Sequence, residues 1–156
     1  TSTYRKRQAE VEAMRDSGRY SSVEIGKGGG YVAIEKSPAH HKPEELEAAR
    51  ILADKGYKVT LKNESGQVRT PDGRIFSASF EQRTPTKDGV NTIRNALFHA
   101  RNKGADIAVI YSKGHAFTRN SVENGIKLYE QSHDYRFKQV VVVADNRNVH
   151  RYKHNK

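Results

Sequence analysis

Residues 43–61, PEELEAARILADKGYKVTL, contain the clearest helix-to-strand transition in the sequence. Pro43 suits the first turn of a helix, acidic residues follow it, and leucine and alanine then recur at helical spacing. Gly56 marks the end of this helix, and the alternation over residues 57–61 is typical of a half-buried strand. The stretch therefore predicts a helix over residues 43–55 that leads directly into a strand.

Helices and strands alternate along the rest of the chain as well. We expect helices at residues 4–16, 87–103 and 120–131, strands at residues 31–35, 74–82, 106–111 and 140–143, and a short hairpin partner at residues 149–153. This order predicts an α/β fold of the α+β kind. We expect a single compact domain, with a small mixed sheet, flanking helices and an N-terminal helical segment.

Two of these elements carry more specific predictions. In the strand at residues 74–82, alternation places Phe76, Ala78 and Phe80 on one face. Gly125 interrupts the helix predicted over residues 120–131.

The N-terminal part of the chain is predicted to be separate from the main domain. Glycines are concentrated at residues 26–30, and such a run is entropically costly inside a helix or strand. We expect an N-terminal helix and glycine-rich linker over residues 1–30 and the functional domain over residues 31–156. The chain starts at Thr1, and its only methionine is Met14, so we expect it to be a piece of a longer polypeptide.

Composition narrows the classes of function. The 156 residues include 28 lysines and arginines against 18 aspartates and glutamates, a formal charge of +10 that favours a polyanionic partner such as nucleic acid. The alternative is a basic protein that its charge merely keeps soluble. The absence of cysteine excludes disulfide scaffolds, thiol nucleophiles and iron–sulfur clusters. No run approaches the roughly 18 apolar residues of a membrane span.

Carboxylates recur at positions that the predicted topology could gather at one sheet edge. Glu45 lies at a helix start, Asp72 follows Pro71 in a turn, and Glu81 lies near a strand end, two residues before Arg83. This order resembles the PD-(D/E)xK nuclease core, in which acidic residues hold a divalent metal that activates water. Arg83 stands where that core has lysine, and its guanidinium suits phosphate binding rather than proton transfer. The alternative is a turn and a strand whose charges face solvent.

A second candidate feature is the segment that leads into the helix at residues 87–103. Arg83, Thr84, Thr86 and Lys87 place hydroxyls and positive charge near a helix N-terminus, which predicts an anion site for a scissile phosphate. The alternative is that Thr86 only caps the helix.

Histidines supply candidate proton-transfer groups. His40 and His41 are adjacent in a predicted loop, and His99 lies on the helix that follows the Glu81 strand. Ribonucleases that use no metal need a general base near the 2′-hydroxyl and cations on the phosphate, and these residue types can fill such roles. The alternative is that these are surface histidines. A zinc site lacks any recognised spacing.

The C-terminal segment, residues 136–156, is basic and carries interleaved rings. Its cations are Arg136, Lys138, Arg147, Arg151, Lys153 and Lys156, and its rings include His150, Tyr152 and His154. Basic residues beside rings that can stack are typical of surfaces that bind single-stranded RNA. The alternative is a frayed basic tail.

The sequence resembles the nuclease domains at the C-terminus of contact-dependent growth-inhibition proteins. The resemblance rests on residues 40–61, the turn at 71–73, residues 80–86 and the helix at 93–100, within a region of roughly residues 31–111. It implies a secreted antibacterial effector fragment that enters a neighbouring bacterium and cuts tRNA in its cytoplasm. It also implies a cognate immunity protein as partner, and elongation factor Tu as an activating partner in some members.

Together these features predict a tRNA-cleaving ribonuclease that needs no cofactor. Glu81 is expected to act as base or orienting group, while Arg83 and the threonines hold the phosphate and a histidine protonates the leaving oxygen. The candidate catalytic residues are His41, Asp72, Glu81, Arg83, Thr84, Thr86 and His99. One alternative is a metal-dependent nuclease on DNA or RNA that uses Glu45, Asp72 and Glu81. Another is a non-catalytic RNA-binding module.

Overall fold

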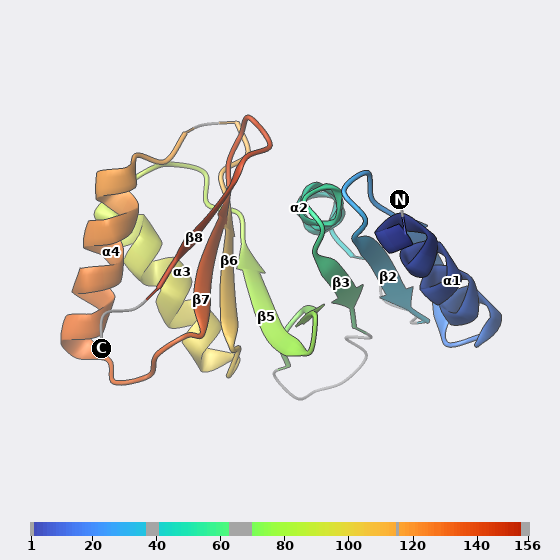
Figure 1. The fold of residues 1–156 in the computed structure, drawn as a ribbon. Helices are drawn as coiled ribbons and strands as arrows, with labels where there is room; N and C mark the ends of the chain where they lie inside the picture. The colour runs from blue at the N-terminus through green and yellow to red at the C-terminus, as the bar shows by residue number, and fades with distance from the viewer. Residues whose placement is uncertain (1, 37–40, 63–69, 115, 154–156) are drawn as a thin grey trace. The chain divides into compact units, whose positions relative to one another are not determined.

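The computed structural model describes residues 2–36, 41–62, 70–114 and 116–153. The chain divides into two compact units, Thr1–Ser77 (unit 1) and Ala78–Lys156 (unit 2) (Figure 1). Both combine helices with mixed parallel and antiparallel strands, so the predicted α+β class with flanking helices is confirmed. In the part of the chain that the structure describes, no helix is long and apolar enough to cross a membrane.

Unit 1 contains two helices and short strands. Its elements are α1 (Ser2–Asp16), β1 (Tyr20–Ile25), β2 (Tyr31–Glu35), α2 (Pro43–Asp54), β3 (Lys58–Leu61) and β4 (Gly73–Ile75). β2 runs parallel to β3, whereas β1 and β4 pair antiparallel with β2 and β3 respectively. Helix α1 packs on β1 and β2 through a small cluster of Val11, Val23, Tyr31 and Ala33. The helix and strand predicted from residues 43–61 are confirmed.

The glycine stretch is a packed turn, where the sequence predicted a linker. It joins β1 to β2, and the Gly30 amide donates to the Ala53 carbonyl at the end of α2 at 3.1 Å. A Cβ on Gly30 would lie 2.2 Å from the Tyr57 carbonyl oxygen, so only glycine permits this approach of the backbones. β1 was not predicted because a single side chain in it, Val23, is fully buried, which leaves little hydrophobic alternation. The predicted domain boundary after residue 30 stays a prediction.

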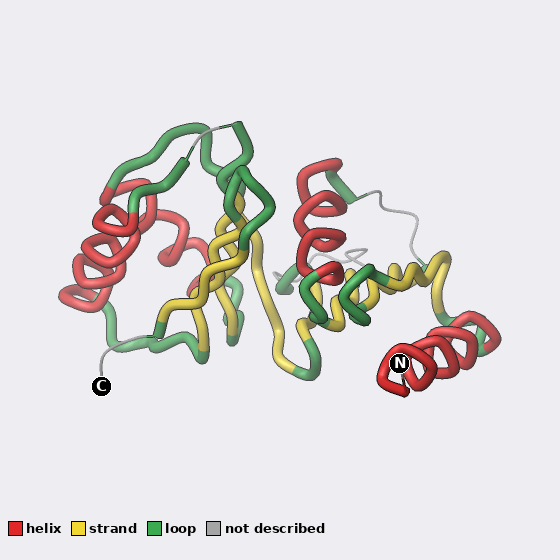
Figure 2. Tube along the Cα trace, turned by 45° about the horizontal axis from the view of Figure 1, so that its top comes forward, coloured by secondary structure: helices red, strands yellow, loops and turns green. Residues whose placement is uncertain are grey.

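Unit 2 is a sheet with two helices on one face. Its elements are β5 (Ala78–Arg83), α3 (Val90–Asn102), β6 (Ile107–Tyr111), α4 (Arg119–Ser132), β7 (Gln139–Val143) and β8 (Val149–Tyr152). β5, β6 and β7 run parallel, and β8 folds back antiparallel on β7, which confirms the predicted hairpin. Figure 1 and Figure 2 both show α3 and α4 on the same side of these strands. Their shared core includes Leu97, Ile126, Ala108 and Val140.

Two predictions about these elements are wrong. The strand predicted at residues 74–82 is two strands, because Phe76 has a positive φ of 53° and reverses the chain between them. Its side chain is 56% exposed and does not share a buried face with Phe80. Helix α4 runs through Gly125 without interruption. A Cβ there would lie 2.5 Å from the Ile93 Cβ, so the glycine serves close packing of α4 on α3.

Candidate functional site

A buried carboxylate and a half-exposed histidine meet in unit 2. The Glu81 side chain on β5 is 5% exposed, and its Oε2 lies 3.2 Å from Nε2 of His99 on α3, whose side chain is 36% exposed. Glu81 pairs in register with Ala108, a residue of the core beneath α3 and α4, so both side chains face the helices. A buried carboxylate is stable only when it is bonded, and His99 supplies a bond here. The fold thus unites two predicted catalytic residues that lie 18 positions apart.

Arg83 lies beside this pair. Its Nη1 is 3.5 Å from His99 Nε2. An ionised carboxylate only accepts hydrogen bonds, so the closer contact assigns the Nε2 proton to the bond with Glu81, and Arg83 is a neighbouring cation. The unprotonated nitrogen of the neutral ring is then Nδ1. Three of the predicted residues, Glu81, Arg83 and His99, therefore form one cluster, which we call the Glu81 cluster.

The threonines that follow β5 differ in their surroundings. The Thr84 hydroxyl accepts a bond from the Gln82 side chain at 3.4 Å, whereas Thr86 is exposed. α3 begins at Val90, after an N-cap at Gly89 that has no side-chain cap, so the alternative role of Thr86 as a cap is wrong.

The predicted anion site at the start of α3 is occupied by a side chain of the protein. Asp88 Oδ1 accepts from the Gly89 amide at 2.8 Å, and its Oδ2 accepts from the Thr118 amide and the Ser121 hydroxyl, both at 3.3 Å. A carboxylate already bound there disfavours a second anion. The geometry therefore favours Arg83, rather than the starts of α3 and α4, as the group that binds the phosphate.

Unit 1 holds a second histidine–carboxylate pair. His41 Nδ1 lies 3.0 Å from Glu45 Oε2, and the two side chains are 5% and 15% exposed. Glu45 is in the first turn of α2, so a residue four positions earlier falls within its reach. Among the described residues, His41 Nε2 is buried and has no hydrogen-bond partner. His40 lies outside the described residues.

The remaining predicted acid, Asp72, is also in unit 1. It is 7% exposed and lies just before β4, where its carbonyl accepts a bond from the Lys62 amide at 3.0 Å. Within the described ranges, no group of three or more histidine, aspartate and glutamate side chains is placed to hold a metal ion. The roles predicted for Asp72 and His41 stay predictions.

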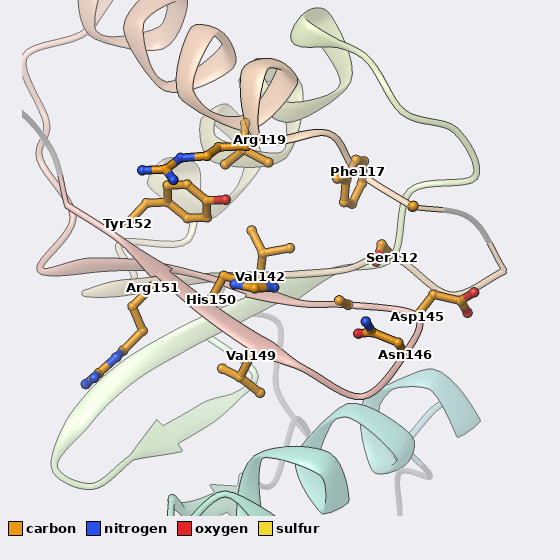
Figure 3. A pocket seen from close by; sticks show the side chains of 13 residues that line it. Ser112, Phe117, Arg119, Val142, Asp145, Asn146, Val149, His150, Arg151 and Tyr152 are labelled. Carbon is orange, nitrogen blue, oxygen red and sulfur yellow. The ribbon is translucent and has the colours of Figure 1, made fainter.

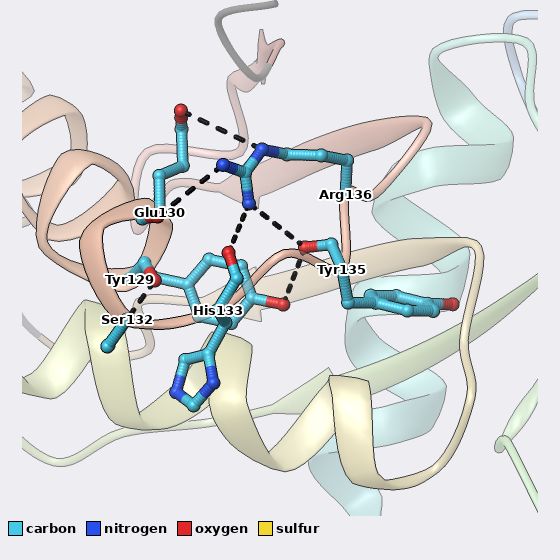
Figure 4. Close-up of polar contacts among 6 residues, drawn as sticks. All are labelled: Tyr129, Glu130, Ser132, His133, Tyr135 and Arg136. Carbon is cyan, nitrogen blue, oxygen red and sulfur yellow. Dashed lines mark hydrogen bonds and ion pairs between the residues drawn. The ribbon is translucent and has the colours of Figure 1, made fainter.

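The basic C-terminal segment serves two different purposes. The Arg136 guanidinium donates to the carbonyl of His133 and, at 3.4 Å, to that of Glu130, so it closes the end of α4 (Figure 4). The β8 residues His150, Arg151 and Tyr152 instead line a pocket in unit 2 (Figure 3). As far as Tyr152 the segment contributes the paired strands β7 and β8, so the alternative of a frayed tail is wrong over that range. His154 and Lys156 lie outside the described residues.

Phe117 and Arg119 are among the other lining residues of the pocket, and the sequence did not single them out. Phe117 lies just before α4 and Arg119 is the first residue of that helix, both far from β8 along the chain. The cap sequence Thr118 to Ser121, in which Thr118 Oγ1 accepts from the Ser121 amide at 3.1 Å, predicts a helix start but no binding role.

Comparisons with known proteins bear on this geometry. The family model for the contact-dependent growth inhibition CdiA C-terminal domain matches residues 69–149. Among solved structures, the chain is similar to the CdiA-CT/CdiI toxin and immunity complex from Burkholderia pseudomallei, with 20% identity and a TM-score of 0.56 over 77% of this chain and 98% of that chain. At this identity the likeness concerns the fold. No curated protein matches the sequence.

Proposed function

Because the chain belongs to the family of contact-dependent growth inhibition CdiA C-terminal domains, we propose that it is an antibacterial toxin domain that cleaves tRNA. The family match covers β5, α3 and β6, and therefore the whole Glu81 cluster. The single observation that supports ribonuclease activity is the contact between the buried carboxylate of Glu81 and the half-exposed His99, with Arg83 alongside.

In the proposed reaction, His99 is the group that touches the substrate. Glu81 is nearly inaccessible and holds the imidazole by Nε2, so Nδ1 takes the proton from the ribose 2′-hydroxyl. The 2′-oxygen attacks phosphorus, the bond from phosphorus to O5′ breaks, and O5′ takes a proton from water. The products are a 2′,3′-cyclic phosphate and a 5′-hydroxyl end. The imidazolium then returns its proton to solvent.

Arg83 has the complementary task of holding the phosphate. Its planar guanidinium has five N–H donors in a fork that matches two phosphate oxygens, and charge gathers on these oxygens during the attack. Arg83 is exposed, as a group that meets a polymer must be. The half-buried Thr84 hydroxyl lies at the end of the same strand and is a further candidate for this contact.

The proposal includes the partners and the place of action that the family resemblance implies. The Burkholderia pseudomallei protein was solved as a complex of toxin and immunity protein. We therefore expect a cognate immunity protein for this chain, with an acidic surface that complements its charge of +10. Action in the cytoplasm of a target bacterium and activation by elongation factor Tu belong to the same proposal.

The test is incubation of the purified chain with total tRNA, with and without EDTA and with and without elongation factor Tu. The variants are Glu81→Gln, His99→Asn and, as a matched control, Glu12→Gln, which changes an exposed glutamate on α1. We expect discrete tRNA fragments with cyclic phosphate ends that persist in EDTA, vanish in the first two variants and remain in the third.

Three results would contradict parts of the proposal. Fragments that EDTA abolishes would favour the metal-dependent alternative. Cleavage of DNA under the same conditions would contradict RNA chemistry through the 2′-hydroxyl. Intact tRNA in every arm, together with salt-dependent binding, would favour a non-catalytic RNA-binding module.

A further inference from the structure

The pocket between α4 and the β7–β8 hairpin has the size and the lining of a nucleotide site. It has a volume of about 790 Å³, within the range of small-molecule sites in proteins. Figure 3 shows Arg119 and Tyr152 at one end, Phe117 and Ser112 at the other, and His150 beside Val142 between them. All of these residues belong to unit 2, as does the Glu81 cluster.

The Arg119 guanidinium gives this pocket a group that can bind an anion. The Arg119 side chain is 83% exposed and pairs through Nε with Glu123 at 2.7 Å, which leaves the other N–H groups of its fork directed to solvent. The lining carboxylate, Asp145, accepts a bond from the Gly114 amide at 3.0 Å. The cations Arg119 and Arg151 are balanced by Glu123 and Asp145, so the group that suits a phosphate here is the exposed remainder of the Arg119 fork rather than a net positive charge.

Rings in the same pocket suit a base. Tyr152 and Phe117 are half-buried, and both pack against the core beneath α3 and α4, which holds their rings in place. Burial raises the pKa of the Tyr152 hydroxyl, partly offset by Arg119, so the ring is neutral near physiological pH. A fixed, neutral aromatic ring that is partly exposed is the usual platform on which proteins stack single-stranded bases.

Strand register relates this pocket to the Glu81 cluster. Arg83 pairs with Ile110, Ile110 with Val142, and Val142 with His150, so one row of residues crosses the sheet from the cluster to the pocket. Three strand spacings, about 14 Å, separate Arg83 from His150 along this row, and its middle residues, Ile110 and Val142, are buried in the core. One end of the pocket, at Ser112 and Ala144, follows the carboxyl ends of β6 and β7, the same end of the parallel strands as Arg83, whereas Tyr152 lies opposite Val140 near the start of β7.

We propose that this pocket binds one nucleotide of a single-stranded segment of the RNA substrate, with the base against Tyr152 or Phe117 and its phosphate on Arg119. The site would select unpaired RNA and hold the strand while Arg83 and His99, in the same unit, act on it. This inference rests on the proposed function for the identity of the polymer. The binding itself is separate from cleavage.

The test measures binding under conditions in which the proposed cleavage cannot occur. A fluorescein-labelled 12-nucleotide single-stranded RNA with 2′-O-methyl groups throughout lacks the attacking hydroxyl, so fluorescence anisotropy reports affinity alone. We expect Arg119→Ala and Tyr152→Leu each to raise Kd about tenfold, the effect of losing one stacked base or one strong phosphate contact. Tyr152→Phe keeps the ring and should stay within about twofold.

The matched control is Arg101→Ala. Arg101 is exposed in the last turn of α3, and its side chain donates a hydrogen bond to the adjacent Asn102. Arg101→Ala removes one positive charge, as Arg119→Ala does, but outside the pocket. We expect less than about a twofold rise in Kd for this variant. Thermal unfolding checks that Tyr152→Leu is folded; if it is not, the exposed Arg119→Ala variant decides alone.

Two outcomes overturn the proposal. Equal weakening by Arg119→Ala and Arg101→Ala would mean that only overall charge matters. Equal affinity for uridine monophosphate and for the oligonucleotide would mean that the pocket takes a free nucleotide rather than an RNA strand. If the unmodified chain does not cleave tRNA but binds the RNA more tightly than Arg119→Ala and Tyr152→Leu do, the proposed function is contradicted and this inference stands.

Discussion

The two histidine–carboxylate pairs have similar N···O distances, but the more buried partner is the histidine in one pair and the carboxylate in the other. In unit 1 the His41 ring is 5% exposed and its partner Glu45 is 15% exposed, and they lie four residues apart at the start of one helix. In unit 2 the carboxylate, Glu81, is the buried member at 5%, and His99, from a different element, is 36% exposed. Only the second pair presents its imidazole to solvent beside an arginine.

This difference in exposure determines which pair can act on a large substrate. A proton-transfer group must come within hydrogen-bond reach of the reacting hydroxyl, so the histidine has to be the accessible partner. His99 meets that requirement, with Glu81 beneath it to fix the ring. His41 has the reverse arrangement, and its buried Nε2 without a partner among the described residues is a cost to stability.

The largest expected effect separates the two pairs by activity. Glu81→Gln removes the negative charge that orients His99 and stabilises its protonated form, so it should lower the rate of tRNA cleavage at least about a hundredfold, the usual contribution of an oriented acid–base group. Glu45→Gln should change the rate less than about threefold, because its pair does not face solvent. Single-turnover cleavage of total tRNA measures both rates.

Circular dichroism and thermal unfolding are the controls for these two variants. Equal rate losses in two folded variants would contradict the distinction between the pairs. That result would restore His41, with Asp72 in the same unit, as catalytic candidates.

The next effect uses the packing that brings His99 to Glu81. In Gly125→Ala, the new methyl group would lie 2.5 Å from the Ile93 Cβ, so α3 must move away from α4. We expect a cost of about 3 kcal/mol from overpacking, reduced by about 1 kcal/mol of helix propensity, and hence a net loss of about 2 kcal/mol. The Glu81 cluster should be disturbed, while the His41–Glu45 contact, which is local, should remain.

Urea unfolding gives the free energy for this variant, and NMR of the histidine rings reports the two pairs separately. A Gly125→Ala chain with unchanged stability and unchanged His99 signals would mean that α3 does not depend on the close approach.

The contrast between the pairs also marks what the sequence could predict. The helix that begins at Pro43 carries its own signals, and the spacing of His41 and Glu45 is fixed by that helix alone. Glu81, Arg83 and His99 were each candidates by residue type. Their meeting depends on the register of β5 on β6 and on how α3 lies on the sheet, which no local pattern contains.

The errors have the same origin. Alternation at residues 74–82 predicted one strand, but a reversal at Phe76 costs backbone strain that only tertiary contacts can offset, such as the bond from its amide to the Lys58 carbonyl at 2.7 Å. Arg136 and Arg119 contribute equally to net charge. One closes the end of α4, and the other lines an open pocket, a difference that composition cannot express.

A third effect concerns the pH dependence of the stability that the Tyr129 hydroxyl on α4 contributes to unit 2. Burial raises the pKa of the Tyr129 hydroxyl to about 12, against the lowering influence of Arg101 and Arg136. The hydroxyl donates to the Tyr135 carbonyl at 2.8 Å, a bond that the ionised form cannot make (Figure 4). Because the folded-state pKa lies above the unfolded value of about 10, this contribution is complete below pH 10 and is lost as pH rises toward 12.

The loss should reach about 2 kcal/mol at the alkaline end of that range. Tyr129→Phe should remove this part of the alkaline slope while costing about 1 kcal/mol at pH 8 for the lost hydrogen bond. Urea unfolding at pH 8, 10 and 11.5 measures both quantities. An identical alkaline slope in the two chains would place the titration elsewhere.

The smallest expected effect tests the cation beside His99. Arg83→Lys keeps the positive charge but loses the planar fork, so we expect KM for tRNA to rise about tenfold with a smaller change in kcat. Arg5→Ala, which removes an exposed arginine on α1 in unit 1, is the control and should leave KM unchanged. Arg83→Lys also gives this strand end the lysine of the PD-(D/E)xK pattern. If the metal-free proposal holds, the Arg83→Lys chain stays insensitive to EDTA, because its chemistry still depends on His99 and Glu81. Activity that rises with added divalent metal and falls with EDTA would instead mean that this strand end is a metal-dependent nuclease site in which arginine replaces the usual lysine.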